Sequence, residues 1–187
     1  MSVVVEVVRL HQVHRARKAS ASAILTTGCT EPTRAAELAG VVTFYDGPED
    51  DTIVAKYVIA GLRPGRHGMH VHESGGADCD AAGKHYKTPI LNADGSVDDE
   101  AMAKQTHGGP LDRDGPRHRG ALGNIVADAS GVARGEVVAN LSVAETIGRT
   151  LVVHADADDL GKGGTAESRE NGTSGERLLG GRIFRMG

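Results

Sequence analysis

His70 and His72 stand one residue apart in the run GMHVH, which covers residues 68–72. Successive side chains of a β-strand point to opposite faces, so residues at i and i+2 share one face. A strand here would therefore present two imidazoles on one sheet surface. Further histidines follow downstream in separate fragments, and they are His85, His107, His118 and His154. Because imidazole is a common metal ligand, we expect these six histidines to form one metal site.

The rest of the sequence predicts an all-β fold. Short runs rich in Val and Ile alternate with turn residues, and the chain has 26 glycines but only 6 prolines. This pattern is typical of short strands joined by tight turns. Helical periodicity is almost absent, so we predict an antiparallel sandwich or barrel. The expected strands cover residues 21–27, 36–45, 52–62, 66–73, 122–128, 132–139, 149–154 and 178–184.

Two long segments interrupt the strand pattern. Residues 74–118 mix Gly, Asp, Lys, His and Pro without regular order, and three of the six histidines lie there. Residues 156–177 form a second stretch that is polar and rich in glycine. Loops of this length in a compact domain are normally functional or disordered. The histidine content favours a functional role, so we expect the site to be built on loops.

Composition limits the class of protein. A chain of 187 residues can form one domain with a core, which must be aliphatic because only 3% of residues are aromatic. A net charge of −4 argues against nucleic acid as a partner, and no apolar run approaches membrane-spanning length. Residues 1–18 are interpreted as a basic N-terminal extension of a domain covering residues 19–187. No clear export signal is present, so a cytoplasmic location is expected.

Several fragments together resemble one protein family. They are GMHVHESGG, AGKHY, THGGP and LGNI, and above all IGRTLVVHADADDLGKGG followed by ESRENGTSGERL. In this order they are similar to the copper/zinc superoxide dismutase family, from about residue 40 to residue 183, and residues 147–164 are the most specific part. The resemblance implies an eight-stranded antiparallel Greek-key barrel, an immunoglobulin-like sandwich with two long functional loops. The strands expected above agree with that fold.

The resemblance also implies a role for each histidine of the site. The implied copper ligands are His70, His72, His85 and His154. The implied zinc ligands are His85, His107 and His118, so that His85 would bridge the two metals. Asp158 would accept hydrogen bonds from His70 and His107 and would thereby orient both rings.

The implied activity is the disproportionation of superoxide to oxygen and hydrogen peroxide. Copper can cycle between Cu(II) and Cu(I), whereas zinc has no redox chemistry. Arg177 would lie beside the copper and receive the superoxide anion, since a guanidinium stays charged at all relevant pH values. His85 would take up a proton and deliver it to the peroxide product. The expected partners are superoxide and a copper chaperone that supplies the metal.

The sequence departs from the family pattern at the zinc site. The family carries an aspartate ligand in an H-x-G-D-L-G-N run, whereas this chain reads HRGALGN and has Ala121 at that position. A methyl group cannot bind a metal, so we expect zinc to bind weakly or not at all. Asp112 and Asp114 are the neighbouring carboxylates that could substitute.

The cysteines depart from the pattern too. Cys79 matches the loop cysteine of the family, but Gly180 stands where the last strand should carry its partner. Cys29 is the only other cysteine of the chain. Either Cys29 and Cys79 are bridged or both are free thiols, and we favour free thiols because a bridge requires Cα atoms within about 7 Å.

Three charged positions also differ. Arg182 and Arg185 lie in the C-terminal strand, where the family packs its dimer through apolar residues. Burying unpaired guanidinium groups is costly, so we expect a monomer or an atypical dimer. Glu170 stands near the place where the family tends to carry a lysine that attracts superoxide. We therefore expect weaker electrostatic attraction of the anion and a smaller salt dependence.

Two other functions compete with the disproportionation of superoxide. A non-enzymatic copper-binding homologue, acting as a decoy or metal buffer, is favoured by the altered zinc site, cysteines and dimer surface. The complete copper ligand set and Arg177 favour the enzyme instead. A metallochaperone for such enzymes would carry an N-terminal module with a CxxC pair, and residues 1–30 contain no such pair.

Overall fold

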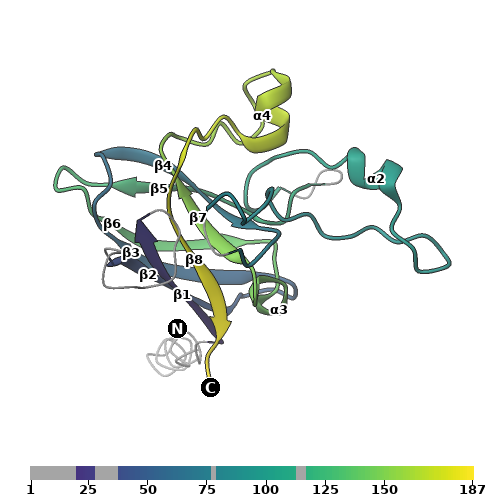
Figure 1. Cartoon of the computed structure of the whole chain (residues 1–187), viewed down its shortest axis with the longest axis horizontal. Coiled ribbons are helices and arrows are strands. Elements are labelled where there is room, and N and C mark those ends of the chain that lie inside the picture. The colour runs from purple at the N-terminus through teal and green to yellow at the C-terminus, as the bar shows by residue number, and fades with distance from the viewer. Residues whose placement is uncertain (1–19, 28–37, 77–78, 113–116) are drawn as a thin grey trace, which may run out of the picture.

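The strands of the protein close into a single antiparallel barrel. In the computed structural model, which describes residues 20–27, 38–76, 79–112 and 117–187, the strand order is β1-β2-β3-β6-β5-β4-β7-β8 (Figure 1). The bounds are β1 Ala21–Thr27, β2 Leu38–Asp46, β3 Ile53–Ile59, β4 Gly65–His72, β5 Ala121–Ala127, β6 Ala133–Ala139, β7 Thr150–His154 and β8 Arg177–Arg185. The expected all-β barrel of eight strands is confirmed, and each strand lies within a few residues of its predicted range.

The described part of the chain also contains three short helices that were not predicted from the sequence. They are α2 (Asp99–Ala103), α3 (Val143–Thr146) and α4 (Ala166–Asn171). Helices this short contain too few turns for hydrophobic periodicity to be visible. For α3, the sequence signal that could have revealed the helix is its N-terminal cap, because Ser142 and Glu145 form a capping box there.

The barrel interior is aliphatic, and it fixes which way the neighbouring histidines point. Met69 and Val71 of β4 are fully buried in the main apolar cluster. Side chains alternate along a strand, so His70 and His72 project from the outer wall of the barrel. β7 repeats the pattern, with Val153 in the core and His154 outside. The candidate ligands thus lie on the outer surface of the barrel and not within it.

Two long connections cover this part of the wall. One joins β4 to β5 and carries α2, and the other joins β7 to β8 and carries α4 (Figure 1). Their cover leaves His70 and His72 buried, although both side chains point away from the core. These connections correspond to the two segments in which the strand pattern was absent.

A small second cluster ties the first of these loops to the barrel. Cys79 and Ala82 pack against Val152, an outward-facing residue of β7. Cys79 is disulfide-bonded, so the preference for a free thiol at this position was wrong. Sequence spacing does not reveal Cα separations, which only the fold sets. Cys29, the other cysteine of the chain, lies outside the described residues.

Some expectations are not addressed by the described part of the chain. The predicted extension, residues 1–18, lies outside it. None of the helices that the structure describes has the length and apolar character needed to cross a membrane. The cytoplasmic location stays a prediction.

We expect the protein to sediment as a monomer of 19.4 kDa or as a dimer that does not pack through Arg182 and Arg185. Arg182 and Arg185 are both exposed on β8, and a partner packed there would have to bury two guanidinium groups. Sedimentation equilibrium across a concentration series measures the mass directly. A stable dimer that dissociates in an Arg182→Glu, Arg185→Glu double variant would contradict this expectation.

Candidate metal centre

The structure brings all six predicted histidines together. His70 and His72 come from β4, His154 comes from the end of β7, and the other three come from the loop between β4 and β5. Every one of the six is buried. They form two overlapping groups in which the ligand atoms lie within 4.8 Å of one another. The first group is His70, His72, His85 and His154, and the second is His85, His107 and His118.

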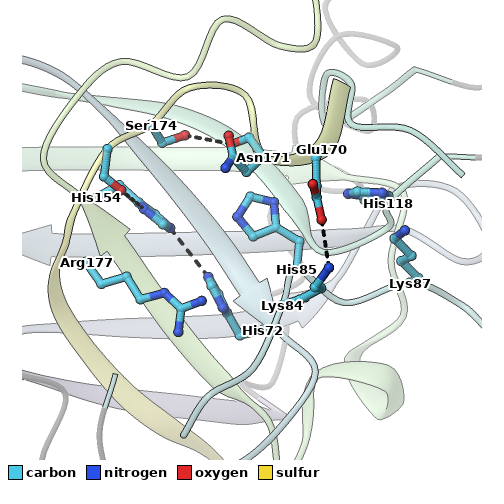
Figure 2. A pocket seen from close by; sticks show the side chains of 11 residues that line it. His72, Lys84, His85, Lys87, His118, His154, Glu170, Asn171, Ser174 and Arg177 are labelled. Atoms are coloured by element: carbon cyan, nitrogen blue, oxygen red, sulfur yellow. Dashed lines mark hydrogen bonds and ion pairs between the residues drawn. The ribbon is translucent and has the colours of Figure 1, made fainter. Parts of the chain in front are cut away.

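The rings of the first group face a common centre. The ring centroids of His70 and His85 are 4.0 Å apart, and the Nε2 atoms of His72 and His154 are 3.4 Å apart. His72, His154 and His85 line one pocket, and His85 lies between the other two and Glu170 (Figure 2). Four imidazoles at this spacing can surround a single metal ion.

Unpaired buried nitrogens mark where metal ions fit. The Nδ1 atoms of four rings are buried without any hydrogen-bond partner among the described residues, and these rings are His70, His85, His107 and His118. Buried polar atoms are nearly always paired, so several orphans in one place require an explanation. A metal ion accepting each lone pair provides it. The donor set therefore fits the metals that imidazole prefers, copper and zinc among them.

Asp158 holds two of these rings by their other nitrogen. Its carboxylate lies 2.9 Å from Nε2 of His70 and 2.8 Å from Nε2 of His107. Asp158 is itself buried, and it accepts a hydrogen bond from the backbone N–H of Leu160 at 2.7 Å. An N–H donated to the carboxylate leaves Nδ1 of each ring as a lone pair facing the metal position.

Backbone carbonyls fix the tautomers of three other rings. His72 and His154 use Nδ1, which lies 2.9 Å from the oxygen of Gly83 and 3.1 Å from that of Gly175, respectively. His118 uses Nε2, which lies 3.1 Å from the oxygen of Gln105. A carbonyl oxygen can only accept, so each bonded nitrogen carries the proton. The opposite nitrogen is therefore free to bind a metal.

Burial keeps these imidazoles neutral. Desolvation is the main cause that lowers the pKa of His72 to about 3 and the pKa values of His118 and His154 to about 4. Desolvation also holds the pKa values of His70 and His85 well below the ordinary value, with help from neighbouring histidines. Neutral rings keep the lone pairs that a metal needs.

Arg177 lines the same pocket. It is the first residue of β8, and its guanidinium donates to the carbonyl oxygens of Cys79 and, at 2.6 Å, Gly83. Gly83 also accepts the hydrogen bond from His72. The loop held by the Cys79 disulfide therefore positions both the arginine and a candidate ligand. Figure 2 shows Arg177 beside His72 at the pocket wall.

Two residues that support the site were missed in the sequence. The Nε2 atom of His67 lies 2.8 Å from the carbonyl oxygen of Arg63, and its Nδ1 atom lies 2.9 Å from that of His154. Its place on the core face, two residues before Met69, was the available signal. Asn124 bonds both the backbone N–H and the carbonyl of Asp158, each at 2.8 Å. Asn124 lies in the fragment LGNI, which contributed to the family resemblance although no role was assigned to its residues.

No carboxylate joins the second histidine group among the described residues. Ala121 is buried beside it at the start of β5 and offers only a methyl group. Asp112 does not replace the missing ligand, because its side chain is exposed and accepts a hydrogen bond from the backbone of Gly109. Asp114 lies outside the described residues.

An eight-stranded barrel with a buried multi-histidine centre on its outer wall defines a β-barrel metalloprotein. The model of the family "Copper/zinc superoxide dismutase" matches residues 38–183, and the chain therefore belongs to this family. Family membership and the two buried histidine groups together support copper and zinc as the metals of the site.

Relatives of two kinds match the chain about equally well. Copper/zinc superoxide dismutases of Candida glabrata and Saccharomyces cerevisiae are 40% and 37% identical, over 76% of this chain and 86% of each relative. The copper chaperone for superoxide dismutase of Rattus norvegicus is 42% identical over 78% of this chain. The match covers 48% of that relative, so the chain spans about half the length of the chaperone.

We expect the metal-free protein to lose stability as pH falls from about 6.5 to about 4. His72, His118 and His154 stay neutral in the folded state down to pKa values of about 3 to 4, while the unfolded chain binds protons near pH 6.5. The unfolded state therefore binds more protons in this window. For each pH unit by which the pH falls in this window, each such histidine lowers the free energy of unfolding by about 1.4 kcal/mol.

Denaturant unfolding at several pH values measures this slope. In a His72→Gln variant, the free energy of unfolding should depend less steeply on pH, by the contribution of one histidine, whatever the stability of the variant at pH 7. An identical slope in the variant and the parent protein would contradict the expectation.

Proposed function

We propose that this protein is a copper-dependent superoxide dismutase. One superoxide is oxidised to oxygen, and a second is reduced and takes up two protons to give hydrogen peroxide. Bound copper supplies the reversible one-electron chemistry that both halves need. The observation that carries the proposal is that Arg177 and three members of the first histidine group, His72, His85 and His154, line one pocket of about 310 Å³. The fourth member, His70, lies behind the lining, with a ligand atom within 4.8 Å of theirs.

The free nitrogens suggest which atoms hold each metal. Copper would be held by Nδ1 of His70 and by Nε2 of His72, His85 and His154. Zinc would be held by Nδ1 of His85, His107 and His118. The hydrogen bonds to Asp158 and to the loop carbonyls support these assignments, because they occupy the opposite nitrogen of every ring except His85.

Arg177 is proposed to bind the superoxide anion. Its two hydrogen bonds to backbone carbonyls fix the guanidinium without cancelling its charge, since carbonyl groups are uncharged. A fixed cation at a partly desolvated wall attracts an anion more strongly than one in water does. The neighbouring histidines are neutral and do not compete for the anion.

His85 is proposed to hold the proton that the peroxide product needs. It belongs to both histidine groups, and its Nδ1 is buried and unpaired. The ring also lines the pocket (Figure 2). Nε2 would therefore carry the proton towards the substrate only while it does not hold the metal, with Nδ1 remaining on the zinc side.

A non-enzymatic copper-binding role is the second candidate. The similarity to copper chaperones for superoxide dismutase favours it, as does Ala121 in the second group. The cysteines no longer favour it, because Cys79 is disulfide-bonded. A copper chaperone also remains the proposed partner that would load the metal.

Superoxide decay after copper loading separates the two candidates. We expect the copper-loaded protein to accelerate the decay, with or without added zinc. A His154→Ala variant should lose copper and activity together, because it removes one of four ligands of the first group. Unbound copper is removed before the assay, because the free ion itself catalyses this reaction. Buffer without copper serves as the control, and a decay rate equal to that control would end the enzyme proposal.

We expect the wild-type protein to lose zinc to a mild chelator. Three neutral imidazoles leave an open coordination position, as in catalytic and not structural zinc sites. An Ala121→Asp variant should bind zinc at least about 10-fold more tightly, since even partners one step removed from the metal change affinity by this factor. An Ala121→Asn variant is the matched control, with the same size and no charge. Stoichiometric zinc that survives the chelator in the wild-type protein would refute this prediction.

A further inference from the structure

The charged side chains of the metal-site pocket do not act alike. The pocket lining includes three cations and one anion among its residues, and these are Lys84, Lys87, Arg177 and Glu170. Arg177 is fixed by the carbonyls of Cys79 and Gly83. The other three come from the two covering loops and determine the charge that an approaching anion meets.

Lys84 and Glu170 neutralise each other. Nζ of Lys84 lies 2.7 Å from Oε1 of Glu170, and the pair links the two covering loops across the pocket (Figure 2). The contact raises the pKa of Lys84 and lowers the pKa of Glu170, so both groups stay charged and paired at neutral pH. A close ion pair has little field at a distance, and this pair contributes little net attraction.

Lys87 is the cation that remains unpaired. It lines the same pocket, and no hydrogen bond or ion pair joins its side chain to the residues that the structure describes. Its charge nevertheless acts within the pocket, because it adds to the lowering of the pKa of Glu170 that the contact with Lys84 mainly causes. Its half-buried position means that solvent screens it less than a fully exposed lysine.

We propose that Lys87 adds to the charge of Arg177 a second positive charge that draws the anionic substrate into the pocket, in place of a cation at position 170. Only the identity of the anion, superoxide, rests on the proposed function. The charge at Lys87 belongs to the loop between β4 and β5, whereas Glu170 belongs to α4. The second charge that attracts the anion thus lies on the loop between β4 and β5 and not on the loop that carries α4.

A Lys87→Gln variant tests the proposal by two measurements. The first is binding of azide, an inorganic anion, to the copper-loaded protein, followed by the visible spectrum of the copper. The second is the rate constant of superoxide decay as a function of ionic strength. We expect azide affinity and the low-salt rate to fall about two- to threefold, as for one partly solvated charge. Both differences should vanish near 1 M salt, where the Debye length is about 3 Å.

Two control variants locate the effect. Lys56→Gln removes a positive charge on β3, outside the pocket, and should match the wild-type protein in both measurements. The double variant Lys84→Gln, Glu170→Gln keeps the net charge and removes the ion pair, and it should also stay close to wild type. If Lys87→Gln behaves like wild type, or if the double variant falls as far as Lys87→Gln, the proposal is overturned.

The two measurements also separate this inference from the proposed function. A copper-loaded wild-type protein that fails to accelerate superoxide decay ends the dismutase proposal, while azide binding still decides the role of Lys87. An active protein whose azide affinity and rate are unchanged in Lys87→Gln ends the Lys87 inference alone.

Discussion

Side chains alternate along β4, and both the core and the metal centre depend on that alternation. Met69 and Val71 fill the barrel, while His70 and His72 stand on the outer wall between and beyond them. A slip of one residue would place imidazoles in the core and apolar groups at the metal position. Folding of the barrel therefore arranges part of the metal centre, and the energy of apolar burial holds two histidines in place.

The covering loops complete what the barrel begins. Each loop carbonyl or carboxylate that accepts from one ring nitrogen determines which nitrogen is free on the other side. Asp158 does this for two rings at once, and Gly83 serves both His72 and Arg177. The long segments without strand pattern therefore have a defined role, because their backbone carbonyl oxygens accept the hydrogen bonds that orient the rings of the site.

Most of the fold could be predicted from the sequence because strand patterns are local. β1 has its predicted bounds, and the alternation around His70 and His72 pointed to a shared face. The misses involve information that no local pattern holds. Cys79 was expected to be free because the separation of two Cα atoms depends on the whole fold, and His67 was overlooked because its acceptors, the carbonyls of Arg63 and His154, lie outside its own pattern.

His85 makes the two halves of the centre interdependent, since it belongs to both histidine groups. Its Nδ1 is buried without a hydrogen-bond partner among the described residues, and leaving such an atom unpaired costs about 1–3 kcal/mol. A metal in the second group relieves that cost and fixes the ring for the first group. With Ala121 in place of a carboxylate, the second group has less affinity with which to do so. The dismutase and the copper-binding candidate therefore differ physically in how firmly His85 is held when copper is bound.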